Sequence, residues 1–364
     1  MNPSVATALD LPYPSPGGSV ELFLDLYTGD RPLIPASAFM LANRPEQTSL
    51  PRGLSVLTVP GKCVEGPGLR AYLKALRQAL AGAIDPTAIS TLHLHHLAFG
   101  ASPALLAALP TARSIALIHG TDLLYAERYA DQLAVLQHCA GAADAIVVPT
   151  NAMADRLLTL APEARKKIEF IPWGIPDHLL NSPRAQQSPR RTDHLRLLYA
   201  GRLTAEKGIE LLLRALAYAP AVELSVAAPP AQFQALAPLL HQLGLHVHYL
   251  GWLRRPQLWK TFRDHDVLVM PSTTLEAMGL VALEAQACGL PVLYQPVPGL
   301  NESVGTSGLA TDFTSPATLA RDLERLRTVP GLLDALREAG RANAARYPLS
   351  ATAAALTALG NQLN

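Results

Sequence analysis

The chain has 364 residues, a length that predicts two domains of ordinary size. Hydrophobic residues make up 49% of the chain and charged residues only 16%, so we expect a large core and little disorder. The net charge of +1 gives no support for a nucleic-acid partner or for strong attachment to anionic lipid. No apolar run reaches the roughly 18 residues of a spanning helix, so no integral membrane segment is predicted; peripheral membrane contact stays open.

The cysteines and histidines indicate no metal site. Cys63, Cys139 and Cys288 are scattered, and such a sparse, odd count suits a reducing compartment. The N-terminus lacks the basic region and long apolar core of a signal peptide, so we expect a cytoplasmic protein. His93 and His95 share one face of a predicted strand, but no third ligand is spaced with them.

The N-terminal half alternates segments typical of strands and of helices. This rhythm predicts a mostly parallel sheet with helices on both faces. Strands are expected at 5–11, 36–42, 54–59, 91–95, 114–119, 144–148 and 167–171, and helices at 19–27, 68–81, 103–109, 125–141 and 151–160.

A polar, basic and proline-containing stretch then interrupts the pattern. It predicts a first domain at 1–176, a hinge at 177–194 and a second domain at 195–346, with the C-terminal helical segment 347–364 completing the first domain. Strands of the second half are expected at 195–200, 222–227, 245–250, 267–270 and 290–294, and helices at 209–219, 231–243, 256–263, 279–288, 315–326, 332–346 and 349–363.

The strongest ligand signal lies between residues 266 and 304. A short apolar strand is followed by a polar loop at 272–279 and then by a helix, and ligands of open α/β sheets bind beyond the carboxyl ends of the strands. Glu276 lies in this loop and Glu284 in the second turn of the helix, so both are placed to face one bound molecule. Trp252 and Trp259 are interpreted as packing residues.

A second signal is the basic pair Arg202 and Lys207, which flanks a turn before a helix. A helix N-terminus favours anions, so the pair indicates a phosphate site, with ordinary solvated charges as the alternative. The Rossmann glycine fingerprint and the P-loop pattern are absent after every predicted strand, which argues against nicotinamide dinucleotides and a P-loop ATPase.

The sequence GRLTAEKG (201–208), followed by LEAMGLVALEAQACGLPV (275–292), resembles the donor-binding half of retaining glycosyltransferases of family 4. The segments PSPGGSVEL (14–22), HLHHL (93–97), IALIHGTDL (115–123), AADAIVVPTNAMADRL (142–157) and IEFIPWGI (168–175) are consistent with the N-terminal half of that family. The resemblance implies a GT-B fold, in which two Rossmann-like domains face each other across a cleft.

The resemblance also implies roles for the donor side. Arg202 and Lys207 would stabilise the leaving diphosphate, Glu284 would bind the ribose, and Glu276 would hold the donor sugar. Further donor contacts are implied for the backbone of Ala277, Met278, Gly279 and Leu280, for Leu283 under the nucleotide, and for the backbone near Leu250 at the base.

On the other side, His119 would face the reacting carbon, with a strand-end histidine satisfied by backbone as the alternative. Gly17 and Gly18 would let backbone approach the diphosphate or acceptor. Weaker acceptor contacts are implied for His95, His96, Thr121, Asp122 and Asn151.

We therefore expect a retaining hexosyltransferase that uses a nucleoside diphosphate sugar, with a UDP-sugar favoured, and a small polar acceptor. Its catalytic residues would be His119, Glu276, Arg202 and Lys207, without a metal or a cofactor beyond the co-substrate. The alternatives are an envelope polysaccharide or glycolipid acceptor, a nucleotide-sugar epimerase or hydrolase, and a two-lobed sugar-binding protein.

Overall fold

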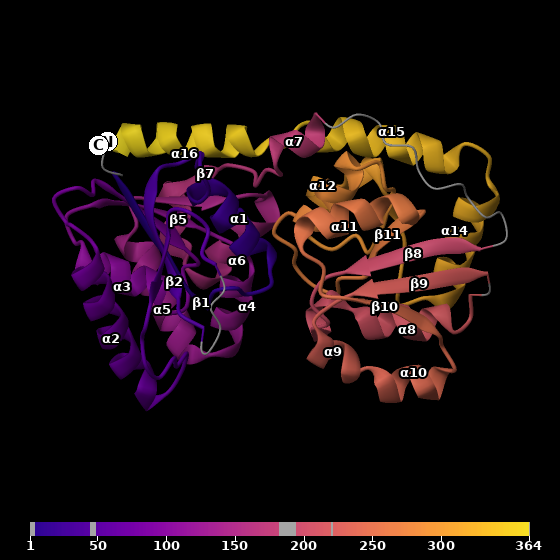
Figure 1. Ribbon diagram of the computed structural model, residues 1–364, viewed down its shortest axis with the longest axis horizontal. Helices are drawn as coiled ribbons and strands as arrows, with labels where there is room; N and C mark the ends of the chain where they lie inside the picture. The colour runs from indigo at the N-terminus through magenta and orange to yellow at the C-terminus, as the bar shows by residue number, and fades with distance from the viewer. Residues whose placement is uncertain (1–3, 44–48, 182–193, 220, 364) are drawn as a thin grey trace. The chain divides into compact units, whose positions relative to one another are not determined.

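The computed structural model describes residues 4–43, 49–181, 194–219 and 221–363, and the chain divides into two compact units (Figure 1). Unit 1 contains Met1–Trp173 and Leu349–Asn364, and unit 2 contains Gly174–Pro348. Within the hinge expected at 177–194, Asp177–Leu180 forms the short helix α7 of unit 2. Residues 182–193 of that hinge lie outside the described residues.

Unit 1 is built on a seven-stranded sheet in the order β3-β2-β1-β4-β5-β6-β7, with every neighbouring pair parallel. The central strands are buried along most of their length, as strands covered by helices on both faces must be. The strands are Val5–Pro12 (β1), Ala36–Leu41 (β2), Leu54–Leu57 (β3), Thr91–His95 (β4), Arg113–Leu117 (β5), Ala145–Val148 (β6) and Ile168–Phe170 (β7).

The helices of unit 1 follow the strands in alternation. They are Gly18–Tyr27 (α1), Pro67–Ala83 (α2), Ala101–Ala108 (α3), Thr121–Arg128 (α4), Ala130–Ala142 (α5), Asn151–Leu160 (α6) and Leu349–Leu363 (α16), with a 3-10 turn at Pro162–Lys167. The single helix expected at 125–141 is wrong, because the backbone of Tyr129 is extended and separates α4 from α5.

Unit 2 repeats this winding in a six-stranded parallel sheet of order β10-β9-β8-β11-β12-β13. The strands are Leu195–Ala200 (β8), Val222–Ala227 (β9), Val247–Gly251 (β10), Val267–Met270 (β11), Val292–Tyr294 (β12) and Leu309–Ala310 (β13). The helices are α7, Ile209–Leu216 (α8), Pro230–Gln234 (α9), Ala237–Leu243 (α10), Arg255–Thr261 (α11), Leu280–Ala287 (α12), Leu300–Ser303 (α13), Pro316–Thr328 (α14) and Leu332–Ala344 (α15).

The structure of unit 2 differs from the expected elements in two ways, and each difference has a local explanation. The helix expected at 231–243 is split into α9 and α10, and the buried Leu236 between them packs into the core. The short elements α13 and β13 were not expected, and each is too brief to carry a periodic hydrophobic pattern.

Alternating side chains of β8 enter two separate cores of unit 2. Leu197 and Tyr199 join the cluster that includes α8 and α14, whereas Leu198 and Ala200 join the cluster that includes α12. This alternation follows from the two-residue period of a strand whose two faces are both covered. Figure 1 shows the covering helices on either side of the strands.

Each sheet begins in its middle and extends first to one side and then to the other. Strands β1 and β4 are therefore neighbours in unit 1, as are β8 and β11 in unit 2. The order reverses between such neighbours, and the crevice beyond their carboxyl ends is where doubly wound sheets bind ligands. The expectation of two doubly wound parallel α/β domains is confirmed.

The last helix, α16, belongs to unit 1. Figure 1 shows it lying along unit 1, and the buried Thr352 donates its hydroxyl hydrogen to the carbonyl of Pro172 at 2.8 Å. Among the described residues, no helix is long and apolar enough to cross a membrane.

The contact of α16 can be tested with a matched pair of substitutions. Thr352→Val removes the buried hydrogen bond to Pro172 and leaves its carbonyl without this donor, so we expect the free energy of unfolding to fall by about 1–2 kcal/mol. Thr357→Val is the control, since Thr357 is exposed and bonds only within the helix, to Ala353. Urea denaturation of both variants measures the difference; equal losses would contradict the assignment.

Candidate functional site

Two loops of unit 2 meet at the reversal of strand order. The loop after β8 spans 201–208, and the loop after β11 spans 271–279. The backbone N–H of Thr273 donates to the carbonyl of Glu206 at 2.9 Å. Gly208 has φ +67°, and a Cβ added there would lie 2.0 Å from the carbonyl oxygen of Pro271. Glycine at 208 therefore permits both the left-handed turn and the close approach of the two loops.

This contact between the loops brings Lys207, near the end of the motif at 201–208, next to Glu276, near the start of the motif at 275–292. The carboxylate oxygen Oε1 of Glu276 accepts hydrogen bonds from Nζ of Lys207 at 2.5 Å and from Oγ of Ser272 at 2.6 Å. Only 8% of Glu276 is exposed, so the ammonium and the carboxylate form a largely dehydrated pair. The predicted donor-site residues Lys207 and Glu276 are thus adjacent in this structure.

The charge of Glu276 is held by its surroundings. Burial alone would raise the pKa of this carboxyl group, but the Lys207 ammonium, the hydrogen bonds from Lys207 and Ser272, and the charge of Arg202 together lower it below its ordinary value. Arg202 is anchored through its backbone, because the buried hydroxyl of Tyr199 donates to the Arg202 carbonyl at 2.6 Å.

A third loop, which contains Pro298 and Gly299, contacts the backbone of Glu276. This contact was not predicted from the sequence. The N–H of Glu276 donates to the carbonyl of Pro298 at 3.1 Å. Gly299 has φ +82°, and a Cβ there would lie 1.7 Å from the carbonyl oxygen of Glu276. The Pro298-Gly299 dipeptide is itself a turn signal, and it is the feature that would have indicated this support.

Glu284, on α12, has a separate set of partners. Its Oε1 accepts from Nε and Nη2 of Arg255 at 3.1 and 2.5 Å, and its Oε2 accepts from the indole Nε1 of Trp259 at 2.9 Å. The Arg255 guanidinium also lies over the Trp259 ring, 5.3 Å from its centroid, and Trp259 meets His178 of α7 edge to face. Trp259 is therefore more than the packing residue that was expected, and Arg255 was missed altogether.

The remaining donor-side candidates form the start of α12 and the end of β10. Gly279 precedes the helix, and its carbonyl accepts from the N–H groups of Ala282 and Leu283. Met278 and Leu283 are buried, so their side chains serve the core of unit 2, and a role of Leu283 under a nucleotide stays a prediction. Ala277, Leu280 and Leu250 are partly exposed.

Unit 1 places its candidates at the carboxyl ends of its own central strands. Gly17 precedes α1 and accepts hydrogen bonds from Val20 and Glu21 at 3.1 Å, while Gly18 is the first residue of that helix. Thr121 and Asn151 are the first residues of α4 and α6. They stay candidates for acceptor contacts.

Asp122 has a structural task that the sequence did not indicate. It is fully buried, and its two carboxylate oxygens accept from the backbone N–H of Leu97 at 3.0 Å and of His119 at 3.3 Å. Both oxygens therefore hold the loops after β4 and β5, and a contact of Asp122 with an acceptor stays a prediction.

Four histidines of unit 1, His93, His95, His96 and His119, form one cluster. Nε2 of His119 lies 3.0 Å from Nδ1 of His95, so the ring of His119 is bonded to another side chain rather than satisfied by backbone. His119 also stacks on Trp173, with ring centroids 5.7 Å apart. His95 and His96 are buried, whereas His119 is partly exposed.

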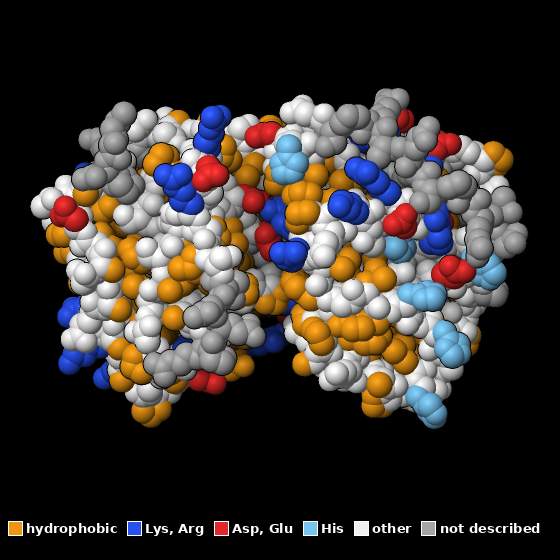
Figure 2. Space-filling model, in the orientation of Figure 1, with side chains coloured by type: hydrophobic (Ala, Val, Ile, Leu, Met, Phe, Trp, Pro, Cys, Tyr) orange, Lys and Arg blue, Asp and Glu red, His pale blue; other side chains and the backbone are white. Residues whose placement is uncertain are grey.

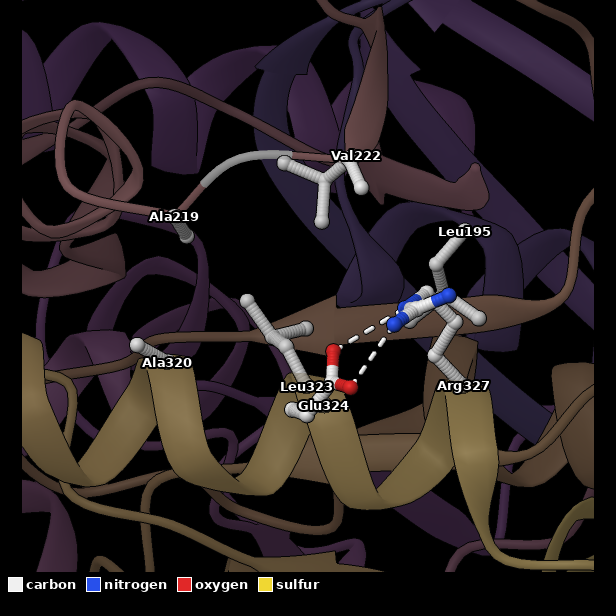
Figure 3. A pocket seen from close by; sticks show the side chains of 8 residues that line it. Leu195, Ala219, Val222, Ala320, Leu323, Glu324 and Arg327 are labelled. Carbon is white, nitrogen blue, oxygen red and sulfur yellow. Dashed lines mark hydrogen bonds and ion pairs between the residues drawn. The ribbon is translucent and has the colours of Figure 1, made fainter. Parts of the chain in front are cut away.

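Other features of the described residues suggest no competing site. A pocket of about 200 Å³ in unit 2 lies at the opposite end of the strands, near Leu195 and Val222 at the starts of β8 and β9 (Figure 3). The ion pair between Glu324 and Arg327 lies at its wall. Within the described ranges, no group of His, Cys, Asp and Glu could hold a metal ion. Basic and acidic side chains are interspersed on the face in Figure 2.

Replacing Arg255 tests how much its guanidinium stabilises the buried carboxylate of Glu284. We expect Arg255→Met to lower the free energy of unfolding by about 3–5 kcal/mol, because it leaves a buried carboxylate without its counter-charge. Lys260→Met is the control, since Lys260 is exposed on the same helix. Urea denaturation of both variants gives the comparison, and a loss below 1 kcal/mol for Arg255→Met would show that the pair behaves as a surface ion pair.

The lowered pKa of Glu276 predicts a pH dependence. A carboxyl group whose pKa is lower in the folded state stabilises the fold above its unfolded pKa, near 4.5, and loses this contribution as the pH falls through the folded pKa. Wild type should therefore exceed Glu276→Gln in stability at pH 7, with the difference shrinking below about pH 4.5. Urea denaturation across this range measures it; a constant difference would contradict the ionic contribution.

Comparison with known proteins places these features in a family. The model "Glycosyltransferase Family 4" matches residues 38–179, and the model "Glycosyl transferases group 1" matches residues 183–343. The sucrose-phosphate synthase of Thermosynechococcus elongatus has a similar structure, with a TM-score of 0.78 at 21% identity over 99% of this chain and 98% of that one. Anabaena HepE, solved with UDP and glucose, gives a TM-score of 0.75 at 19% identity over 99% of both chains.

Curated relatives share more sequence but less length. D-inositol 3-phosphate glycosyltransferase 1 of Catenulispora acidiphila is 32% identical over 227 residues, which are 57% of this chain and 54% of the relative. The D-inositol 3-phosphate glycosyltransferase of Mycolicibacterium smegmatis is 34% identical over 184 residues, 47% of this chain and 42% of the relative. The chain thus spans about half the length of the curated relatives it matches. The two consecutive family matches and the two doubly wound units identify the chain as a member of glycosyltransferase family 4, with the GT-B fold.

Proposed function

We propose that this protein transfers a hexosyl group from a nucleoside diphosphate sugar to a hydroxyl group, with retention of configuration. The observation that carries the proposal is the joined pair of loops in unit 2, where Lys207 and Glu276 are held together beside Arg202. Two cations and a carboxylate at the reversal of strand order suit a ligand that combines a diphosphate with sugar hydroxyls.

Lys207 and Arg202 are assigned to the diphosphate. Charge grows on the leaving nucleoside diphosphate as the bond to the sugar breaks, and fixed cations in a partly dehydrated site stabilise that charge. Glu276 keeps Lys207 in place through their ion pair, and the same carboxylate is assigned to the hydroxyls of the donor sugar. Because these cations supply the positive charge, the proposed reaction needs no metal ion.

Glu284 is assigned to the ribose. A carboxylate oxygen has lone pairs beyond those that Arg255 and Trp259 use, so Glu284 can accept from ribose hydroxyls while these partners hold it. The acceptor hydroxyl would attack from the side of the leaving group and pass its proton to a diphosphate oxygen. His119 of unit 1 is assigned to the reacting sugar, as its match to the family motif implies.

We favour a UDP-sugar as donor and a small polar molecule as acceptor. The names of the curated relatives support an acceptor of this class, since they are called D-inositol 3-phosphate glycosyltransferases. The complexes of Anabaena HepE with UDP and with UDP-glucose support the choice of donor.

The donor is tested by thermal unfolding with the diphosphates of uridine, guanosine, adenosine and thymidine and with their sugars. A bound nucleotide stabilises the native state by mass action, so we expect uridine diphosphate to raise Tm most. Product analysis with a polar acceptor such as an inositol phosphate then separates transfer from the alternatives. Free sugar or an epimerised donor without acceptor would indicate a hydrolase or epimerase, and transfer only to a lipid-linked acceptor would overturn the small-acceptor assignment.

Removing the ammonium tests the phosphate assignment. Lys207→Ala should reduce kcat/KM, with a loss of transition-state stabilisation of about 2–4 kcal/mol, because the leaving diphosphate loses one charged donor. Lys260→Ala, on the exposed face of α11, should leave the rate unchanged. Steady-state kinetics with the best donor gives both values; a wild-type rate for Lys207→Ala would remove Lys207 from the mechanism.

A further inference from the structure

A chain of side-chain hydrogen bonds crosses unit 1 behind His119. The hydroxyl oxygen of Tyr27, at the end of α1, lies 2.8 Å from Nδ1 of His93 and 3.1 Å from Nε2 of His95. The other nitrogen of His95, Nδ1, lies 3.0 Å from Nε2 of His119. These four residues, His93, Tyr27, His95 and His119, are called the histidine–tyrosine relay below.

The relay is buried at all of its members except His119. His93, Tyr27 and His95 are each 1% exposed, and only His119 is partly exposed. Burial lowers the pKa of His93 to about 4 and those of His95 and His119 well below the ordinary value, with neighbouring histidines adding to the effect. Burial also raises the pKa of Tyr27. Burial therefore favours the neutral form of all four groups.

The number of hydrogens restricts how the relay can be hydrogen-bonded, because each neutral imidazole carries one N–H and each hydrogen bond needs one hydrogen. In one arrangement His93 donates to Tyr27, Tyr27 donates to Nε2 of His95, and Nδ1 of His95 donates to His119. In the reverse arrangement His119 donates to His95, His95 donates to Tyr27, and Tyr27 donates to His93. Only in these two arrangements does each of the three contacts contain one hydrogen while the Tyr27 hydroxyl donates within the relay.

The two arrangements differ in what His119 offers at its other nitrogen. In the first, all three histidines carry hydrogen on Nδ1, so Nδ1 of His119 is a donor. In the second, all three carry hydrogen on Nε2, so Nδ1 of His119 is an acceptor. In a mixed set, two ring atoms would meet with no hydrogen or with two hydrogens between them, or the buried Tyr27 hydroxyl would have no acceptor in the relay. A buried unsatisfied group is costly.

We propose that Tyr27, His95 and His93 are positioning residues that set the tautomer of His119, and with it the hydrogen-bonding role that His119 offers to a sugar hydroxyl. The consequence for sugar transfer rests on the proposed function, whereas the coupling of the tautomers does not. The ring of His119 is also fixed in place, because it stacks on both His95 and Trp173.

The coupling is tested on the wild-type protein by NMR of nitrogen-15-labelled histidine, in which the two ring nitrogens of a neutral imidazole report its tautomer. We expect His93, His95 and His119 to carry the same tautomer at pH 7. Single His→Gln variants at these positions assign the signals among the 11 histidines of the chain. A mixed set of tautomers, or a charged ring at any of the three, would overturn the proposal whatever the activity of the protein.

A matched pair of variants tests the role of Tyr27. Tyr27→Phe removes the bridging hydroxyl, so we expect the His119 signals to move towards an average of both tautomers and kcat to fall on the order of tenfold. Tyr72→Phe is the control, because Tyr72 is equally buried in unit 1 but bonds to Asp10, outside the relay. Unchanged His119 signals in Tyr27→Phe would overturn the role of Tyr27, and absence of sugar transfer in the wild type would instead contradict the proposed function.

Discussion

The candidate donor site depends on the contact between the loops that follow β8 and β11. These loops are more than 60 residues apart in the chain and meet backbone to backbone, through Thr273 and Glu206 and through Gly208 and Pro271. The approach is too close for any side chain at position 208. It places Lys207 on Glu276 and lets a buried carboxylate keep its charge, so the chemistry of the site follows from a constraint on the backbone.

The two carboxylates of unit 2 are held in different ways. Glu276 is in a loop and depends on an ammonium, a hydroxyl and the turn at Gly299. Glu284 is in a helix and is held by the guanidinium of Arg255 and the indole of Trp259. Planar, multiply bonded partners restrict the orientation of a carboxylate more than a single ammonium does. This contrast fits a fixed role for Glu284 and a more adaptable one for Glu276.

Unit 1 uses the same winding but a different polar interior. Its candidates also follow the central strands, because β4 and β5 end at His95 and just before His119. The polar candidates of unit 2 are charged, whereas those of unit 1 include several imidazole rings. The carboxylate of Asp122 in unit 1 accepts hydrogen bonds from backbone N–H groups. A network of neutral groups suits the recognition of hydroxyl groups, whereas the charges of unit 2 suit phosphate.

Periodicity and motif spacing, read from the sequence, were enough for the α/β class, most strands and helices, the division into two domains of one architecture and the family resemblance. Arg202, Lys207, Glu276 and Glu284 stood out because short motifs carry them. The break at Tyr129, the support from Gly299, and the partners Arg255, Trp259 and Tyr27 were decided only by the tertiary structure. Local patterns reflect which side of an element is buried, but not which distant side chain will meet a given carboxylate or imidazole, because that pairing depends on how the strands are ordered in the sheet.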